Sequence, residues 1–282
     1  MPLSRKLLGM NKLREIFTNS GSTWAYAIIS AIFTLIPETV FQCGFIPCDL
    51  SDAAIIIVNR IIVSVIVFMV ANIAYVYYKK CRKSVEVTGK NFTISIEYDD
   101  LFNIENGKKV VNFDECFNTK VGQMPGDIKP DSICGQYLAK YPIEDMQNLL
   151  QLADIHPVGV SKYNKQPKYK LGTIMPRDNF FLMAFTELDK DGLSRMTYEH
   201  YLDCLDFLWQ EIDKYHGTED VYIPIIGSKI TRLDKELSQQ ELLDVMIASY
   251  RLSPHKLKNP HTLHIVCKER DGFTLNDIWG VK

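Results

Sequence analysis

The sequence lacks an excess of charge of either sign. It carries 32 Lys and Arg residues against 34 Asp and Glu residues, a net charge of −2, and charged residues make up 23% of its 282 positions. A chain with this balance has neither a polyelectrolyte tail nor the basic surface that neutralises nucleic-acid phosphates. We therefore expect a folded protein that does not bind nucleic acid.

Paired cysteines are also missing. The seven cysteines form no CxxC pair, and five of them fall in segments that we place in a reducing cytoplasm: Cys81, Cys116, Cys134, Cys204 and Cys267. Cys43 and Cys48 share the loop that we place on the outer side of the membrane. There, either a small disulfide between them or two unpaired thiols is possible. His255, His261 and His264 have no second ligand cluster, so we expect surface polar residues and no metal site.

Signature motifs of enzymes and channels are absent as well. The chain has no GxSxG elbow, no HExxH helix and no GxxxxGK[ST] phosphate loop. It also has no TVGYG segment, which disfavours a dedicated potassium channel. We expect no catalytic residues and no cofactor.

What the sequence does have is two long apolar runs near its start, Thr23 to Phe45 and Ile55 to Tyr78. The run from Ile61 to Tyr78 contains one strongly polar residue, Asn72. As a helix with a rise of about 1.5 Å per residue, its eighteen residues have a length close to the hydrocarbon thickness of a bilayer. Pro37 and Glu38 interrupt the first run, which still needs to reach Phe45 to cross. The alternative of a signal peptide is disfavoured, because small residues do not precede any cleavage point near Cys43.

Charged residues around these runs predict their orientation. Lys and Arg residues precede the first run and follow the second: Arg5, Lys6, Lys12, Arg14, Lys79, Lys80, Arg82 and Lys83. The connecting loop is mostly acidic, with Glu38, Asp49 and Asp52 beside Arg60. By the positive-inside bias, we expect a multi-pass protein of the inner (plasma) membrane with both termini in the cytoplasm.

The remaining chain has the pattern of an α/β domain. We expect spans at about 23–45 and 55–78 in an N-terminal region 1–83, and a cytoplasmic domain at 84–282. Predicted strands are Phe92 to Tyr98, Lys109 to Asn112, Asn179 to Leu188, Val221 to Ile226 and Thr262 to Cys267. Predicted helices are Ser132 to Tyr141, Thr197 to Tyr215, and one that begins at the capping box of Ser238 and Glu241. Alternating strands and helices indicate a three-layer α/β/α fold with a mixed, largely parallel sheet. We expect the stretch from Ile155 to Thr173 to be a long, mobile surface loop.

One strand end has the chemistry of a phosphate-binding loop. The buried strand that starts at Val221 leads into Gly227, Ser228, Lys229, Ile230, Thr231 and Arg232. Glycine and serine leave backbone N–H groups unshielded for a diphosphate, and the two cations would favour it. A plain surface turn is the alternative.

Two further strand ends suit a nucleoside. Asn112 ends a strand and offers its amide to a ribose, while Phe113 or Phe117 would close over a ring. The alternative is a capped turn over two core phenylalanines. Upstream, Asp100 and Leu101 follow the first strand of the domain, and the carboxylate suits an adenine amino group.

These three loops, in this order, resemble the macro domain, the ADP-ribose-binding α/β fold. In that family an Asp takes the adenine, an Asn-rich loop faces the distal ribose, and a Pro-x-x-Gly-x-Gly loop wraps the diphosphate. The matching positions are Asp100, Asn112 and the run that starts at Pro224. Lys229 replaces the second glycine, and Asp114 with Glu115 replaces the small residues and second Asn of the usual Asn-Ala-Ala-Asn. Both departures argue against the hydrolase activity of some macro domains.

Longer segments resemble one branch, the membrane-anchored macro-domain effectors of type II Thoeris antiphage systems: SICGQYLAKY, YKLGTI, FFLMAFTELDKDGLSRMT and IPIIGSKITRL. The resemblance implies that a TIR-domain enzyme converts NAD into an ADP-ribose conjugate, expected to be histidine-ADP-ribose. The macro domain would sense this signal, the chain would oligomerise in the lipid bilayer, and membrane disruption would abort the infection. Candidate contacts for the amino-acid end of the conjugate are Gln136, Lys170, Gly172 and Arg177.

Ionisable residues inside the spans are the last candidates. Glu38 and Arg60 lie toward the outer leaflet, where such groups tend to be paired or functional. We expect them to pair in the resting hairpin or to line the membrane lesion, with interfacial snorkelling of Arg60 as the alternative. Two other functions stay open, a membrane-tethered ADP-ribosyl hydrolase with Asp114 as its base, and an inert docking domain.

Overall fold

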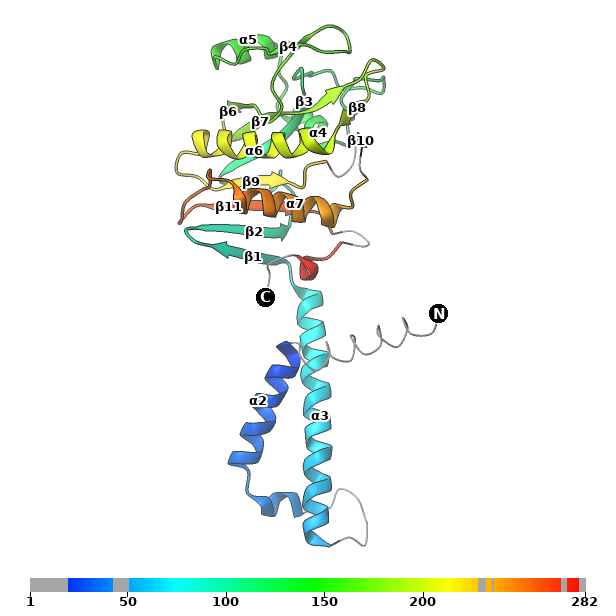
Figure 1. Cartoon of the computed structure of the whole chain (residues 1–282), viewed down its shortest axis with the longest axis vertical. Coiled ribbons are helices and arrows are strands. Elements are labelled where there is room, and N and C mark those ends of the chain that lie inside the picture. Colours follow the sequence, from blue (N-terminus) through cyan, green and yellow to red (C-terminus); the bar gives the residue numbers. More distant parts are fainter. Residues whose placement is uncertain (1–19, 43–50, 228–231, 235, 270–272, 279–282) are drawn as a thin grey trace. The chain divides into compact units, whose positions relative to one another are not determined.

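The computed structural model describes residues 20–42, 51–227, 232–234, 236–269 and 273–278. The chain divides into two compact units, Met1–Arg82 and Lys83–Lys282. The sequence predicts a division one residue later. Element labels are those of Figure 1.

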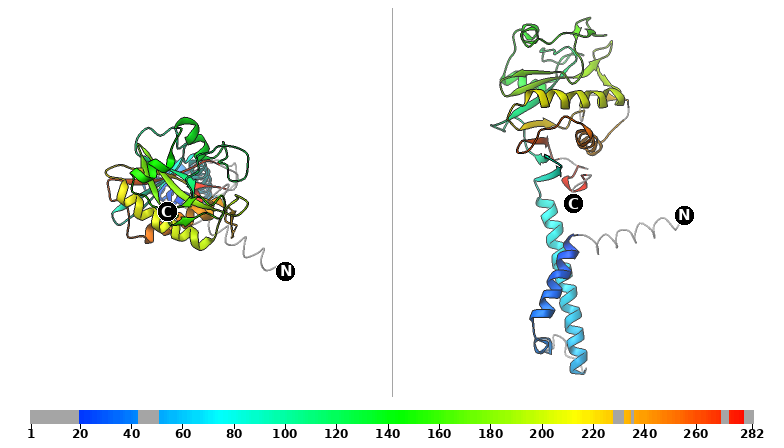
Figure 2. Two further views of the ribbon diagram at one scale, coloured as in Figure 1. Left: turned by 90° about the horizontal axis from the view of Figure 1, so that it is seen from above. Right: turned by 60° about the vertical axis from the view of Figure 1, so that its left-hand side comes forward.

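The first unit contains one long helix and one shorter helix beside it. Helix α2 (Ser20–Leu35) is followed by the short 3-10 helix η1 (Glu38–Gln42) and then by α3 (Asp52–Cys81). In both views of this unit α2 lies alongside α3 (Figure 1; Figure 2). Among the described residues, α3 is the helix long and apolar enough to cross a membrane. Its 30 residues extend about 45 Å.

The predicted first span differs from the structure. We expected one continuous span from Thr23 to Phe45, but α2 ends at Leu35. Pro37 explains the break, because its ring fixes φ, removes an N–H donor and disfavours helical geometry at the residue before it. The 16 residues of α2 extend only about 24 Å. Residues 43–50, which include Cys43 and Cys48, lie outside the described chain.

Polar contacts hold η1 against α3. Arg60 Nη2 lies 3.0 Å from Glu38 Oε1, and the Arg60 guanidinium lies 5.5 Å and 5.4 Å from the ring centroids of Phe33 and Phe41. The buried Asn59 side chain donates to the Phe41 carbonyl at 2.7 Å. The two ionisable residues singled out in the sequence are therefore neighbours in this unit.

The second unit is built on a nine-stranded sheet with the order β1-β2-β11-β9-β3-β7-β8-β10, in which β6 also pairs with β7. Its strands are β1 (Ser84–Gly89), β2 (Phe92–Tyr98), β3 (Lys108–Asp114), β6 (Ile174–Arg177), β7 (Phe180–Leu188), β8 (Ser194–Met196), β9 (Val221–Pro224), β10 (Arg232–Leu233) and β11 (Thr262–Cys267). Neighbours from β2 through β11, β9 and β3 to β7 all pair parallel. The outer pairs β1–β2, β6–β7 and β7–β8 are antiparallel. The predicted mixed, largely parallel sheet is confirmed.

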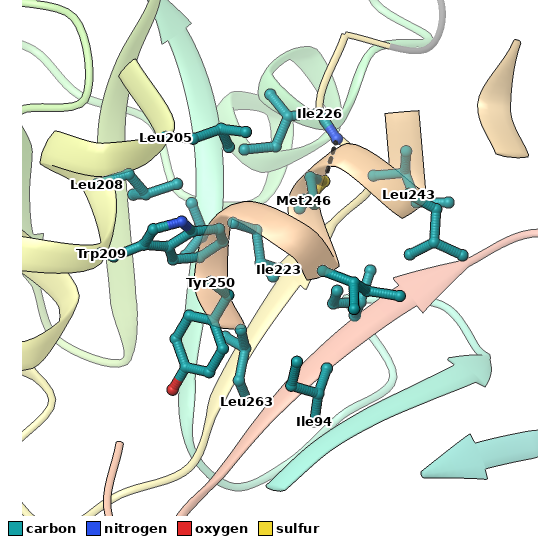
Figure 3. Close-up of a cluster of buried hydrophobic side chains, with 14 of the residues drawn as sticks. Ile94, Leu205, Leu208, Trp209, Ile223, Ile226, Leu243, Met246, Tyr250 and Leu263 are labelled. Carbon is teal, nitrogen blue, oxygen red and sulfur yellow. Dashed lines mark hydrogen bonds between the residues drawn. The ribbon is translucent and has the colours of Figure 1, made fainter. Parts of the chain in front are cut away.

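Helices cover the two faces of this sheet, so the fold has three layers. Helices α6 (Tyr198–Tyr215) and α7 (Gln239–Leu252) lie next to each other on one face (Figure 1; Figure 2). Figure 3 shows side chains of both helices, among them Leu208, Trp209 and Met246, in one buried cluster with Ile94 and Leu263 of the sheet. Helices α4 (Ile133–Lys140) and α5 (Met146–Leu152) bury Tyr137 and other side chains against the opposite face.

Alternation along the strands produces these two cores. In β7, Phe181, Met183 and Phe185 join the cluster under α6 and α7, whereas Leu182 and Ala184 join the cluster under α4 and α5. Successive side chains of a strand point to opposite faces, so an unbroken apolar run fills both cores.

Most predicted elements are present within two residues of their expected bounds. Side chains of Ser132, Thr197 and Ser238 cap α4, α6 and α7, and the capping box of Ser238 with Glu241 is formed. The short strands β1, β6, β8 and β10 were not predicted. The stretch from Ile155 to Thr173 is not a plain loop, since it contains the hairpin of β4 (Gly159–Val160) and β5 (Pro167–Lys168).

Candidate functional site

A cavity of about 580 Å³ opens at the carboxyl ends of the parallel strands. Its floor comes from residues at or just after the ends of β2, β11, β9, β3 and β7, and its roof from α4 and the loop before it (residues 123–132). Parallel strands bring all these ends to one edge of the sheet, where open α/β folds bind their ligands. The volume is in the range that holds a small molecule.

Seven residues predicted to contact a ligand line this one cavity: Asp100, Leu101, Asn112, Phe113, Asp114, Gln136 and Gly227. Four others, Ser228, Lys229, Ile230 and Thr231, lie outside the described residues, and of Arg232 only the backbone is described, at the start of β10. The predicted loops come from three separate strands, and the sheet order places them side by side.

Asp100 lies at the end of the cavity formed after β2 and β11. Its Oδ1 accepts the Phe102 N–H at 3.0 Å, and its Oδ2 lies 3.3 Å from Lys268 Nζ. The Phe102 N–H and then the Lys268 charge hold the pKa of Asp100 below its usual value. The carboxylate is therefore ionised at neutral pH.

Gly227 marks the middle of the cavity floor, three residues beyond the end of β9. Its φ of +87° lies in the left-handed region that favours glycine. Two contacts hold the backbone of Ile226, the residue before Gly227. The Ile226 N–H lies 3.5 Å from Met246 Sδ, and Tyr201 Oη donates to the Ile226 carbonyl at 3.2 Å. Those two contacts anchor the residue just before the turn.

Asn112 presents an acceptor without a partner. Its Oδ1 is buried and is among the few such side-chain atoms of the described residues with no hydrogen bond. Because leaving a buried acceptor unpaired is costly, an orphan at a cavity wall is typical of a ligand contact. Of the two neighbouring rings, Phe113 lines the cavity, whereas Phe117 is not among the described lining residues. Phe113 and Phe117 are buried and pack on Tyr137 and Tyr169 in the core.

Asp114 braces the loop that follows β3. Its Oδ1 accepts the N–H groups of Cys116 and Asn118 at 2.9 Å and 3.2 Å, and its Oδ2 accepts Asn118 Nδ2 at 2.8 Å. Burial raises the pKa of Asp114 despite these donors. Both oxygens accept hydrogen bonds within the loop, which gives this carboxylate a structural role.

Helix α4 begins at the cavity and is held at its far end. Ser132 Oγ accepts the Gly135 N–H at 3.0 Å, and Gln136 lines the cavity from the first turn. Arg177 donates to Tyr137 Oη and to the Tyr141 carbonyl at 3.0 Å and 3.2 Å.

Three of the four residues expected to bind the amino-acid end of a ligand lie elsewhere. Arg177 ties down the end of α4, Lys170 Nζ lies 3.5 Å from the Phe207 ring centroid, and Gly172 packs against the backbone of α6. Of that group, Gln136 lines the cavity.

Sequence reasoning missed one wall of the cavity. It consists of residues 123–129 and of the turn between β7 and β8, including Gly192, Leu193 and Ser194. Neither segment contains a known motif. The available signal was a pair of turn glycines, Gly126 and Gly192, and nothing in the sequence shows that they meet.

The chain is similar in sequence to proteins of one family. The model of the family described as "Thoeris protein ThsA, Macro domain" matches residues 94–268. The Thoeris protein ThsA of Bacillus amyloliquefaciens (strain Y2) is 26% identical over 264 residues, which cover 90% of this chain and 86% of that protein. Among solved structures, a mutant of the Oceanobacillus iheyensis macrodomain aligns with 67% of this chain and 91% of its own, with a TM-score of 0.40 and 10% identity.

The hydrogen bonds that Asp114 accepts predict that its loss destabilises the folded domain. We expect Asp114→Ala to lower the free energy of unfolding by about 2 kcal/mol, because three donors lose their acceptor in a buried loop. Asp131→Ala, which removes an exposed carboxylate from the same cavity, is the control and should cost less than about 0.5 kcal/mol. Urea unfolding measures both. Equal losses in the two variants would contradict the assignment.

Proposed function

The chain belongs to the family of Thoeris ThsA macro-domain proteins, and from this premise we propose that it is a membrane-anchored antiphage effector whose macro domain is a receptor for an ADP-ribose-type signal. The observation that carries the proposal is the single cavity at the carboxyl edge of the sheet, lined by Asp100, Gly227 and Asn112 in the order of their strands. That order suits adenine, diphosphate and second ribose in turn.

The physical properties of the cavity suit such a ligand. Asn112 Oδ1 offers a buried acceptor to a ribose hydroxyl, and Gly227 leaves the backbone open to a diphosphate. The described lining contains two cations, Lys268 at the Asp100 end of the cavity and Lys129 in the roof, beside five aspartates. In this proposal a partner TIR-domain enzyme supplies the signal, expected to be histidine-ADP-ribose.

The proposed role is binding without catalysis. A hydrolase needs a base that can reach a water molecule beside the ribose, and both oxygens of Asp114 already accept hydrogen bonds from the loop. Binding energy would instead favour an assembled state of the chain, since a ligand shifts an equilibrium by its difference in affinity for the two states.

The proposed output is oligomerisation and membrane disruption. Helix α3 has the length and composition of a membrane span, and α2 with η1 would form the other limb of a hairpin with both termini in the cytoplasm. The Glu38–Arg60 ion pair would stabilise the resting hairpin, because an unpaired charge in a bilayer is costly.

Titration calorimetry on the full-length protein in lipid nanodiscs tests the receptor. We expect ADP-ribose or its histidine conjugate to bind with no breakdown of the ligand, and Gly227→Glu to weaken binding at least about a hundredfold, since the new carboxylate would repel the diphosphate. Gly217→Glu is the control. Gly217 also has a positive φ, and a Cβ there meets no atom within 4 Å. Binding that survives Gly227→Glu would overturn the site, and ligand hydrolysis would favour the enzyme.

Thiol labelling tests the topology. We expect a membrane-impermeant maleimide to reach the loop cysteines Cys43 and Cys48 in intact spheroplasts after mild reduction. Cys81, which is exposed in the structure, should be labelled only after lysis. Single-cysteine variants measured by mass shift separate the sites. Labelling of Cys81 in intact spheroplasts would reverse the orientation.

Replacing Glu38 tests the ion pair. We expect Glu38→Gln to lower the signal dose needed for toxicity by about tenfold, because Arg60 loses its countercharge in the resting hairpin. Asp52→Asn, at the start of α3, serves as the control. Cell survival against signal dose and crosslinked oligomer size are the measurements. Unchanged toxicity and assembly would remove Glu38 from the mechanism.

A further inference from the structure

The polar side chains in the middle of α3 all lie on one side of the helix. Between residues 57 and 78 the exposed side chains are apolar or tyrosine: Ile57, Ile61, Val65, Ile66, Met69, Val70, Ile73, Ala74, Val76, Tyr77 and Tyr78. Apart from tyrosine, the polar side chains of this stretch are buried or half-buried: Asn59, Arg60, Ser64 and Asn72. We call these four the polar side of α3. The exposed side is suited to lipid, because hydrocarbon offers polar groups no partner.

Residues that precede α3 in the chain cover its polar side. The contacts are Ser22 Oγ donating to Asn72 Oδ1 at 3.3 Å, Asn59 Nδ2 donating to the Phe41 carbonyl at 2.7 Å, and Arg60 Nη2 at 3.0 Å from Glu38 Oε1. Helix α2 and the short helix η1 thus supply a partner at three of the four positions. The polar side is hidden in this unit, although the groups that form it could also face water.

The polar side is long enough to line most of a path through a bilayer. From Asn59 to Asn72 the helix rises about 20 Å, and the hydrocarbon core of a bilayer is about 30 Å thick. Lys79, which is also half-buried, lies seven residues further along the same helix, near its cytoplasmic end in the proposed topology. Polar groups therefore recur on α3 from the depth of Arg60 to the predicted inner surface of the membrane.

The charge on α3 beyond its first turn has one sign. Residues 53–81 contain Arg60, Lys79 and Lys80 and no Asp or Glu. The countercharge of Arg60, Glu38, belongs to η1, and its side chain is 70% exposed against 31% for Arg60. Arg60 Nε is buried and has no hydrogen-bond partner among the described residues. The guanidinium therefore keeps a donor that an anion could use.

Resting on the proposed function, we propose that the membrane lesion is a pore lined by the polar side of α3, and that this pore conducts anions in preference to cations. Assembly places one Arg60 from each chain around a common path, and separation of η1 from α3 removes the Glu38 countercharge. Rings of Arg or Lys are a common lining of anion pores. Rupture of the bilayer, the other route to membrane disruption, has no protein lining and no preference for one charge.

Current through planar bilayers that contain the full-length protein tests the selectivity. Histidine-ADP-ribose is added on both sides, and the reversal potential is measured across a gradient of KCl. We expect the potential to lie toward the equilibrium potential of chloride. Arg60→Gln should lower the ratio of chloride to potassium permeability at least about threefold, and Arg60→Glu should reverse the preference. Asp52→Asn, an exposed position at the start of α3, is the control and should keep the ratio.

Two neighbouring positions on opposite sides of α3 supply a matched pair of variants. Ser64 is half-buried on the polar side, whereas Val65 is exposed on the apolar side, so Ser64→Cys and Val65→Cys place a thiol at nearly the same depth. We expect a charged methanethiosulfonate reagent to reduce the ligand-induced current of Ser64→Cys at least about twofold, because its thiol faces water in the pore. Val65→Cys should respond like the unmodified chain, which also controls for the native cysteines.

The possible outcomes separate the pore from the rest of the mechanism. A ligand-induced current without charge preference, unchanged in both Arg60 variants and equally sensitive to the reagent in both cysteine variants, overturns the lined pore and leaves the effector standing. A preference for potassium in the unmodified chain overturns the role given to Arg60. Absence of any current while calorimetry shows bound histidine-ADP-ribose overturns membrane disruption as the output.

Discussion

Parallel pairing of β2, β11, β9, β3 and β7 is the constraint on which the rest of the structure depends. The central strands β3 and β7 have buried apolar side chains on both faces, so they need helices above and below. The connection between parallel strands must cross over the sheet. All five strands then end at the same edge, and the loop after each strand lies next to the loops after its neighbours. The cavity lies at this edge because the chain leaves the sheet there five times.

Buried carboxylates organise the loops at this edge. Asp114 and Glu115 lie at the end of β3. Between them they accept hydrogen bonds from the loop after β3, from Ser161 and from Leu188 at the end of β7. Burying a carboxylate is costly unless donors surround it. Burial raises the pKa of Asp114 even so, which means that its donors offset only part of this cost. This pair of carboxylates therefore helps to fix the shape of the site.

The first unit poses the opposite physical problem, because its described helices are mostly apolar and have only a few polar side chains. Arg60 faces the Glu38 carboxylate and the rings of Phe33 and Phe41, and Asn59 satisfies a carbonyl of η1. These contacts hold the irregular segment after Pro37 against a regular helix. In a bilayer such contacts would contribute more to stability, because no water competes for the same polar groups.

The sequence by itself determined the apolar runs, the helix caps, the strands and the α/β class of the second unit, because each depends on periodicity or on residues a few positions apart. It also identified Asp100, Asn112 and Gly227 as strand-end residues, since each lies at or just after the end of a recognisable strand. The break of the first apolar run at Leu35 was signalled by Pro37, and its effect was underestimated. Only the tertiary structure decided which strands are neighbours, that Arg177 holds α4, and that Gly126, Tyr163 and Gly192 meet. These contacts join segments as far apart in sequence as Thr93 and Thr262, which pair in β2 and β11. Packing across such distances depends on the whole sheet order, which no local pattern encodes.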